Sequence, residues 1–346
     1  MGSKRNKLIR RNFLKATGAA IGGGALASFE AKTVAANEGG PSIKKPLSPK
    51  VVVLPAFEVG DIKGDTAGEF QLWYKNYDLD KKLDVSGTNA PLYYNDDGLA
   101  VTPTGIGKSA ATTTVTSILS SPKLKFDDNT LFLTAGIAGA PPDVGTLGSV
   151  FISDAVVDWD LMHRWSRNDG PADPYAAMKL DPSSEKYYEL NDGLTTLAYY
   201  LGQQADLIDS DRAKQYREFY EEKTANQEPF VDMGTTVCGD EYWHGSTFSE
   251  QARWMCDELY DVGRYATSEQ EDYGTATALA RHGYLDQYLS IRSVSNFDQP
   301  HPNQTIEESL NEADSGGFGP SIQNVFRVTS EIVDVILQRA SNNHSN

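Results

Sequence analysis

Acidic and glycine residues follow the predicted strands of this chain, where an open α/β sheet holds its ligands. Glu58 comes shortly after a buried apolar strand predicted over 50–54, and Gly105 and Gly107 stand where a strand over 99–102 turns into a helix. Glycine lets the backbone approach a ligand closely, and the N–H groups at a helix start can bind an anion or a sugar hydroxyl. The pattern predicts a ligand site. Alternatively, the glycines form a plain strand-to-helix turn and Glu58 caps the turn after its strand.

Later strand ends carry further polar or small residues. They are the small-residue loop 135–142, the CGDEYWHG stretch 238–245, and Asn296-Phe297-Asp298 after the strand 288–295. Glu271 begins a predicted helix, as the helix dipole favours. These segments extend the candidate site along one edge of the sheet.

The elements that position these residues alternate along the chain. Strands are predicted over 50–54, 99–102, 130–134, 148–154, 230–237 and 288–295, and helices over 108–119, 187–201, 248–259, 271–282 and 322–337. Segments 71–77 and 92–94 are aromatic but have little pattern. Strands that alternate with helices predict an α/β fold with a mixed central β-sheet flanked by helices. The 39% hydrophobic content is enough for a full core.

The N-terminus has the features of a targeting segment. Arg10 and Arg11 begin a twin-arginine motif, an apolar run over 16–29 follows, and 34–36 supplies small residues for cleavage. We expect a twin-arginine signal peptide over 1–36, a linker over 37–49, one domain over 50–340 and a tail over 341–346. The mature protein would be periplasmic or extracellular. A basic disordered tail is the alternative interpretation of this segment.

Charge and composition exclude several classes of partner. The net charge of −17 argues against nucleic acid, whose phosphates require a basic surface. After the leader, the chain has no apolar run of about 18 residues, so no membrane span is expected. The five histidines are scattered, and neither a metal site nor a cofactor is expected. Cys238 and Cys256 could form a disulfide or remain free core thiols.

Several motifs, taken in order, resemble the nucleoside phosphorylase and nucleosidase superfamily. They are TGIGKSAA (104–111), TAGIAG (134–139), VGTLGSVFISDAV (144–156), VCGDEYWHG (237–245) and RSVSNF (292–297). Within the superfamily, GDEYWHG and EDYGTATAL are most similar to the purine nucleoside permease family, and the resemblance covers roughly residues 50–338. It implies a nucleoside phosphorylase-like fold, a purine nucleoside as ligand and a homo-oligomer.

The resemblance also implies roles for single residues. Tyr242 would stack on the purine, Glu271 would accept hydrogen bonds from the ribose hydroxyls, and Asn296 would contact the N7 side of the base. Glu58 would orient a water molecule or a hydroxyl group. With the turn glycines and Asp298 included, the candidate substrate-binding residues are Gly105, Gly107, Ala138, Gly139, Asp240, Tyr242, Trp243, Glu271 and Arg292, and the candidate catalytic residues are Asn296, Glu58 and Asp298.

Three departures from the superfamily pattern bear on the reaction. Asn296 stands where many nucleosidases have an aspartate, and Gln270 replaces the methionine before the ribose glutamate. No arginine lies between Asn12 and His163, and Lys63 and Lys108 are the basic residues close to the predicted ligand loops. Arginine is the residue best suited to hold phosphate, so hydrolysis is favoured over phosphorolysis, and phosphate is a disfavoured partner.

Three functional classes therefore remain after the sequence is read. The favoured one is an exported enzyme that cleaves the N-glycosidic bond of a purine nucleoside, with Asp298 as a candidate source of the proton that Asn296 cannot donate. The second is a non-catalytic nucleoside-binding component of nucleoside transport. The third is an exported domain with an unrelated small-molecule site.

Overall fold

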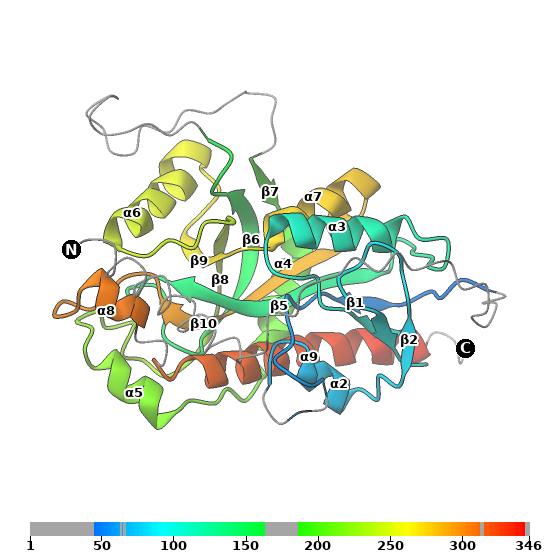
Figure 1. Ribbon diagram of the computed structural model, residues 1–346, viewed down its shortest axis with the longest axis horizontal. Coiled ribbons are helices and arrows are strands. Elements are labelled where there is room, and N and C mark those ends of the chain that lie inside the picture. The colour runs from blue at the N-terminus through cyan, green and yellow to red at the C-terminus, as the bar shows by residue number, and fades with distance from the viewer. Residues whose placement is uncertain (1–44, 63, 65–66, 163–185, 312–314, 343–346) are drawn as a thin grey trace, which may run out of the picture.

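The computed structural model describes residues 45–62, 64, 67–162, 186–311 and 315–342. Within this part of the chain, ten strands form one sheet: β1 (Val51–Val53), β2 (Lys81–Leu83), β3 (Leu92–Tyr94), β4 (Leu99–Val101), β5 (Leu131–Ala140), β6 (Val150–Asp158), β7 (Tyr187–Glu189), β8 (Val231–Cys238), β9 (Tyr265–Glu269) and β10 (Tyr288–Phe297). The sheet contains parallel and antiparallel pairs, which confirms the predicted α/β fold with a mixed central sheet (Figure 1).

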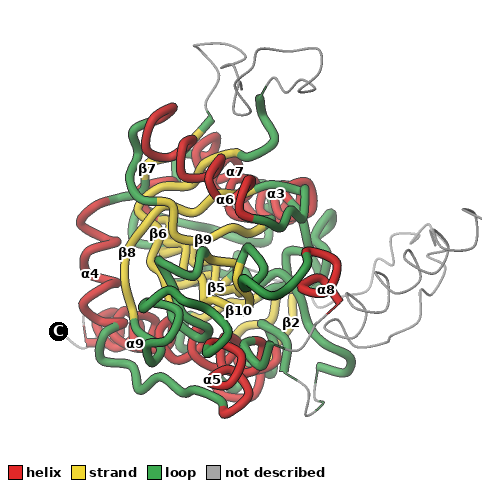
Figure 2. The backbone as a smooth tube through the Cα atoms, turned by 90° about the vertical axis from the view of Figure 1, so that its left-hand side faces the viewer, coloured by secondary structure: helices red, strands yellow, loops and turns green. Residues whose placement is uncertain are grey.

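Helices cover the sheet on both faces. They are α2 (Gln71–Asn76), α3 (Lys108–Leu119), α4 (Asp192–Gly202), α5 (Asp211–Arg217), α6 (Ser246–Trp254), α7 (Asp272–His282), α8 (Ile306–Asn311) and α9 (Phe318–Asn342), with a π-helical turn at Met255–Tyr260 and a 3-10 turn at Leu285–Gln287. Helices α3 and α7 lie side by side on one face, and α9 runs along the other (Figures 1 and 2).

Part of the sheet closes on itself. The strand order is β10-β6-β8-β9-β5-β1-β4-β3-β2, with β7 beside β6, and β10 also pairs in parallel with β5. The antiparallel contact of Gly139 with Ser268 joins β5 to β9. Strands β5, β10, β6, β8 and β9 therefore form a ring, and the ends of β5, β9 and β10 meet where the predicted site residues stand.

The alternation of side chains along β1 explains why helices pack on both faces. Val51 and Val53 face the core cluster that includes Val328 of α9, whereas Val52 faces the cluster that includes Val115 of α3. Successive residues of a strand point to opposite faces, so a continuous run of valines buries both.

Helices α3 and α7 approach each other closely at Gly274. A Cβ atom at this position would lie 2.3 Å from the carbonyl oxygen of Lys108 and 2.7 Å from Oγ1 of Thr112. Only glycine fits such an approach. This packing brings the starts of the two helices, at Gly107 and Glu271, to the same place.

The structure differs from the predicted elements at several points. The expected loop 135–142 is mostly strand, because β5 continues to Ala140 and pairs with β10 along this length. The predicted helix 187–201 begins as β7, which pairs with β6, before α4 starts at Asp192. Strands β2, β3 and β9 and helices α2 and α8 were not predicted. They are short, so their stability comes from tertiary pairing and packing rather than from local pattern.

Both cysteines are buried and free. This finding decides between the two states that the sequence left open. The described residues contain no helix that is long and apolar enough to cross a membrane. The predicted signal peptide, 1–36, lies outside the described residues.

Candidate functional site

The N-terminus of α3 lies at the centre of the candidate site. Gly105 and Gly107 have φ angles of +85° and +97°, a left-handed conformation that glycine adopts readily. The amide of Gly107 donates a hydrogen bond to Oε1 of Glu271 (3.0 Å), and the amide of Lys108 donates to Oδ1 of Asp240 (2.8 Å). A helix N-terminus is ordinarily an anion site. Here its donors bind carboxylates of the chain itself.

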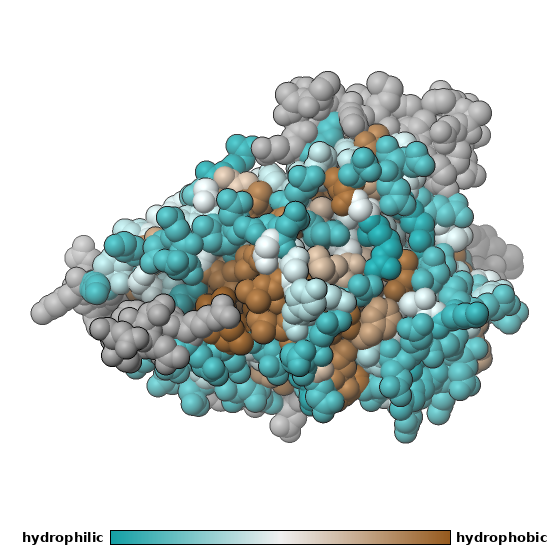
Figure 3. Space-filling view, turned by 180° about the vertical axis from the view of Figure 1, so that it is seen from behind, coloured by the Kyte–Doolittle hydropathy of each residue, from teal (hydrophilic) through white to brown (hydrophobic). Residues whose placement is uncertain are grey.

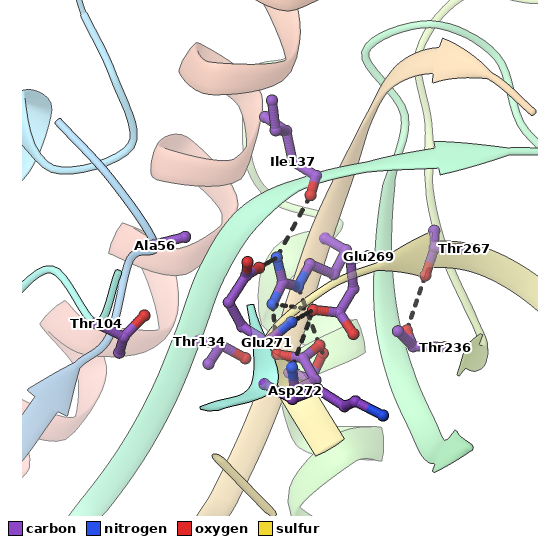
Figure 4. Close-up of polar contacts among 12 residues, drawn as sticks. Ala56, Thr104, Thr134, Ile137, Thr236, Thr267, Glu269, Glu271 and Asp272 are labelled. Atoms are coloured by element: carbon purple, nitrogen blue, oxygen red, sulfur yellow. Dashed lines mark hydrogen bonds and ion pairs between the residues drawn. The ribbon is translucent and has the colours of Figure 1, made fainter. Parts of the chain in front are cut away.

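Arg292, on β10, is 2% exposed and sits among carboxylates. Its guanidinium contacts Asp272 through Nε (3.0 Å) and Nη2 (2.6 Å), Glu269 through Nη2 (2.6 Å) and Glu271 through Nη1 (3.3 Å). Figure 4 shows Glu269, Glu271 and Asp272 grouped at this point. Arg292 was expected to bind substrate. In the structure its donors contact these buried acids, and its role in substrate binding stays a prediction.

Asp272 is the member of the cluster best suited to carry a negative charge. Besides Arg292, it accepts hydrogen bonds from the hydroxyls of Tyr288 (3.0 Å) and Ser290 (2.5 Å). Burial opposes ionisation of Asp272, but the charge of Arg292 and the hydrogen bonds outweigh it and lower the pKa below the ordinary value. Asp272 and Arg292 therefore form the neutralised ion pair of the cluster.

The neighbouring glutamates respond differently. Burial raises the pKa of Glu269 to about 8 and raises that of Glu271, although Arg292 opposes both shifts. One guanidinium cannot neutralise several buried carboxylates, so the remaining acids favour their protonated forms. The cluster thus retains exchangeable protons near neutral pH.

Glu69 joins this cluster from the segment before α2. Its side chain is buried, and its two oxygens accept hydrogen bonds from the amides of Ala56 (2.6 Å) and Ile137 (2.8 Å). A Cβ atom on Gly136 would lie 2.8 Å from Oε1 of Glu69 and 2.6 Å from Nη1 of Arg292, so both groups crowd against this glycine.

The position of Glu69 also changes its acidity. Burial raises the pKa of Glu69 to about 7, with Arg292 lowering it and Glu271 raising it. A carboxyl group that titrates near neutral pH suits general acid–base catalysis. Glu69 thus lies among the acids of the site and has a pKa matched to a proton-transfer role.

Gln71 holds the segment that carries Glu69. Its amide oxygen accepts hydrogen bonds from the amides of Val59 (3.2 Å) and Gly68 (2.7 Å), and its Nε2 donates to the carbonyl of Val59 (2.5 Å). These bonds tie the two ends of the segment together. The buried side chain of Gln71 therefore fixes the position from which Glu69 enters the site.

Asn296 lies at the end of β10, against Gly139 of β5. A Cβ atom on Gly139 would lie 3.1 Å from Oγ of Ser268 and 3.2 Å from Nδ2 of Asn296, so these two side chains converge above the glycine. Asn296 accepts a hydrogen bond from Oγ of Ser295 (2.9 Å) and donates to the carbonyl of Phe297 (3.1 Å). Both Asn296 and Ser268 are half-buried, so a ligand can reach them.

Asp298 is placed differently from Asn296. It is 2% exposed, and its Oδ2 accepts hydrogen bonds from the hydroxyls of Ser249 on α6 (2.8 Å) and Tyr265 on β9 (3.0 Å). Asp298 is therefore connected to neighbouring strands and helices rather than open to solvent.

The loop 239–245 borders the turn at Gly107. A Cβ atom on Gly107 would lie 3.0 Å from Oδ1 of Asp240, which places the two segments in contact. Tyr242 is 56% exposed, and Trp243 stacks on the buried Trp159 with ring centroids 5.1 Å apart. Tyr242, two residues after Asp240, thus offers an accessible ring, whereas Trp243 belongs largely to an aromatic cluster.

The structure links some of the predicted residues directly. Gly107, Asp240, Glu271 and Arg292 are linked through the contacts above. Glu58, the predicted acid after the first strand, has an exposed side chain, and the buried acid at this edge of the sheet is Glu69.

The sequence contains only a weak signal for Glu69. An acid directly before a helical segment indicates a helix start. The segment 71–77 has too little apolar pattern to predict a helix. The sequence therefore predicts no helix next to Glu69 that would have indicated it as a candidate.

Lys108 is not available to bind phosphate as the structure stands. Its Nζ contacts Oδ1 of Asp158 (2.7 Å) and Oδ2 of Asp160 (2.8 Å). Among the described residues, no group of three or more His, Cys, Asp or Glu side chains is arranged to hold a metal ion.

Comparisons with known sequences identify one family. The family described as Purine nucleoside permease (NUP) matches residues 48–346. A probable purine nucleoside permease of Schizosaccharomyces pombe is 30% identical over 263 residues, which cover 69% of this chain and 75% of that protein. A purine nucleoside permease of Candida albicans is 24% identical over 292 residues, which cover 77% of this chain and 71% of that protein.

Comparisons with solved structures support the fold. A futalosine hydrolase of Helicobacter pylori superposes with a TM-score of 0.55 at 18% identity, covering 83% of this chain and 97% of that one. A 5'-methylthioadenosine/S-adenosylhomocysteine nucleosidase of the same organism, bound to butyl-thio-DADMe-Immucillin-A, gives a TM-score of 0.55 at 16% identity, with 83% and 99% coverage. At these identities the likeness establishes the shared nucleosidase-like fold.

Proposed function

The chain belongs to the purine nucleoside permease family, and from that membership we propose that it binds a purine nucleoside and hydrolyses its N-glycosidic bond. The observation that carries this proposal is the placement of Glu69. It is a buried acid with a pKa of about 7, and it lies in one cluster with Glu271 and Arg292 beside the turn at Gly107. A purely binding pocket has no need of an acid that titrates near neutral pH.

Each acid has a separate task in the proposed reaction. Glu271 accepts hydrogen bonds from the ribose hydroxyls with the lone pairs that Gly107 and Arg292 leave free. Glu69, when ionised, takes a proton from the attacking water. When Glu271 is ionised, its charge favours the oxocarbenium-like transition state, because positive charge develops on the ribose as the bond to the base breaks.

Two further residues are assigned to the base in this proposal. Tyr242 offers an exposed ring on which a purine can stack. Asn296 lies at Gly139 with its carboxamide within reach of a ligand, and we assign it the hydrogen bond to the N7 side of the base.

Water is the preferred nucleophile in this proposal. The amides of Gly107 and Lys108 already bind carboxylates, the Lys108 ammonium group is paired with two aspartates, and Arg292 is engaged with buried acids. A phosphate ion would have to displace carboxylates from these donors, against the repulsion of a negatively charged site. Water requires no such displacement.

A binding protein without catalysis is the second candidate. The observation that favours it is Asn296, since an amide cannot act as a general acid when the base departs. In that case the same pocket captures a purine nucleoside for uptake.

One assay separates these functions. The protein is incubated with inosine, guanosine or adenosine, with and without phosphate, and free base and sugar are measured by chromatography. Base plus free ribose without phosphate supports hydrolysis, whereas ribose 1-phosphate formed only with phosphate contradicts it. Unchanged nucleoside that co-elutes with the protein favours the binding function.

We also propose that copies of the chain associate. Figure 3 shows apolar surface gathered near the middle of the face opposite to that of Figure 1. Contiguous exposed apolar surface often marks an interaction site. Sedimentation velocity should show a species heavier than one chain, and a monomer at all concentrations would contradict the proposal.

A further inference from the structure

Asp298 is a buried acid with an unsatisfied oxygen. Its Oδ2 accepts hydrogen bonds from Ser249 and Tyr265, but its Oδ1 is buried and has no hydrogen-bond partner among the described residues. A buried carboxylate whose second oxygen lacks a donor is poorly stabilised as an anion. Asp298 therefore favours holding a proton.

The groups around Asp298 agree with this conclusion. Burial raises the pKa of Asp298 to about 7, while the hydrogen bonds from Ser249 and Tyr265 and the charge of Arg253 on α6 lower it. Asp143, after β5, raises it but is paired with Arg253. The hydroxyl of Tyr220, from the segment after α5, also lies close enough to interact with the charge of Asp298. Asp298 can thus gain and lose a proton near neutral pH.

A chain of hydroxyl groups connects Asp298 to the candidate site. The phenol of Tyr265 lies 3.0 Å from Oδ2 of Asp298, and the hydroxyl of Ser268 lies near enough to this phenol to lower its pKa. Both Tyr265 and Ser268 stand on β9, three residues apart. The Ser268 hydroxyl reaches the point above Gly139 where Asn296 also converges. The buried acid is therefore linked, through two hydroxyls, to the accessible point assigned to the base.

We propose that Asp298, Tyr265 and Ser268 form a proton relay that protonates the departing purine, in place of the direct transfer that Asn296 cannot make. This inference rests on the proposed function. Before the reaction, Asp298 donates to Tyr265, Tyr265 to Ser268, and Ser268 to N7 of the base.

The proposed step conserves protons and electrons. As the C–N bond breaks, its electron pair moves onto the base. Each proton of the relay then moves to the next group. Ser268 gives its proton to N7, Tyr265 gives its proton to Ser268, and Asp298 gives its proton to Tyr265. Asp298 becomes a carboxylate that accepts hydrogen bonds from Tyr265 and Ser249, which is the arrangement in the structure. Water adds its oxygen to the ribose, its proton passes through Glu69 to solvent, and Asp298 regains a proton from solvent.

The test compares two leaving groups. Inosine requires protonation of its base, whereas 4-nitrophenyl β-D-ribofuranoside releases a stable anion and does not. Asp298→Asn and Tyr265→Phe should each lower kcat/KM for inosine by about 100-fold and change that for the nitrophenyl riboside by less than about threefold. Ser249→Ala is the matched control, since it removes a hydrogen bond to the same Oδ2 outside the relay, and it should change both rates by less than about tenfold.

A second measurement does not depend on substrate. The infrared C=O band of a protonated carboxyl group near neutral pH should be reduced in Asp298→Asn relative to the wild type, and Tyr265→Phe should retain it. If Asp298→Asn does not fold, Tyr265→Phe tests the relay by itself.

The possible results separate the relay from the proposed function. Wild-type rates for inosine in both relay variants, or equal losses for the two substrates, would overturn the relay and leave hydrolysis standing. A wild-type protein that cleaves neither substrate would overturn the proposed function, and the relay with it.

Discussion

Two glutamates near the end of the first strand have different surroundings and therefore different chemistry. Glu58 has an exposed side chain, so water solvates its charge. Glu69 is buried against Arg292 and Glu271, and its pKa rises to about 7. Its position after a strand made Glu58 the predicted catalytic acid. Burial and neighbouring charges, however, set the pKa of a carboxyl group, and in Glu69 they raise it toward the range that suits proton transfer.

Substitution of the two glutamates tests this difference. Glu69→Gln should lower kcat for purine nucleoside hydrolysis by about 100- to 1,000-fold, because an amide cannot accept the proton of the attacking water. Glu58→Gln is the matched control and should leave kcat unchanged. Steady-state assays of free ribose check both, with circular dichroism to verify folding. Equal activity of Glu69→Gln and the wild type would remove Glu69 from the mechanism.

At the scale of elements, the site depends on how closely α3 packs against α7. The first helix carries Gly107 at its start and the second follows Glu271, and these residues are joined by a hydrogen bond of 3.0 Å. The close approach at Gly274 sets the spacing of the two helices. A defect in this packing should therefore affect both stability and ligand binding.

Gly274→Ala provides the test at this scale. The added methyl group would meet the Lys108 carbonyl, so we expect the free energy of unfolding to fall by about 2–3 kcal/mol and KM for the nucleoside to rise. Gly319→Ala, where a Cβ has open space near the start of α9, should change stability by less than about 1 kcal/mol. Denaturant unfolding measures both variants. Equal stabilities would show that α3 and α7 tolerate a wider spacing.

At the scale of the whole molecule, buried acids make stability depend on pH. The pKa rises from 4.5 to about 7 in Glu69, from 4.5 to about 8 in Glu269 and from 3.8 to about 7 in Asp298. At pH values between the ordinary pKa and the raised pKa of these groups, the folded state binds more protons than the unfolded state. The stability that these groups contribute is present below about pH 4 and is lost as pH rises through about 7–8.

We therefore expect the melting temperature to fall as pH rises from 5 to 8. Asp272 has a lowered pKa, so its contribution to stability is lost as pH falls rather than as pH rises. That loss occurs below pH 3.8, outside the range of this experiment. Repulsion within a chain of net charge −17 also lowers the melting temperature as pH rises. The pH series of melting temperatures is therefore repeated at high salt, which screens surface charges. Glu69→Gln and Asp298→Asn should flatten the slope. A melting temperature that rises over this range would contradict the assigned shifts.

The predicted twin-arginine leader, 1–36, also acts at the scale of the whole molecule. Replacing Arg10 and Arg11 together by lysine should prevent export, so that the precursor accumulates in the cytoplasm, because the pair is the recognised part of the signal. Arg5→Lys, outside the pair, is the control and should be exported normally. Immunoblots of fractionated cells measure the distribution. Unchanged export of the double variant would argue against this route.

The sequence alone determined the elements whose information is local. The run of valines at 51–53 indicated a buried strand, the glycine turn at 105–107 indicated the helix that begins at Lys108, and ordered motifs at strand ends indicated the family. Periodicity and turn chemistry are properties of neighbours in sequence, so they are readable without a fold.

Tertiary structure alone decided which polar groups meet and what their acidity is. It extended β5 to Ala140 through pairing with β10, left Glu58 exposed while it buried Glu69, and enclosed Arg292 among acids. These outcomes depend on burial and on charges brought together from distant parts of the chain. Desolvation and Coulomb interactions act through space. The order of residues along the chain does not indicate which charged groups will lie close together or be buried away from water.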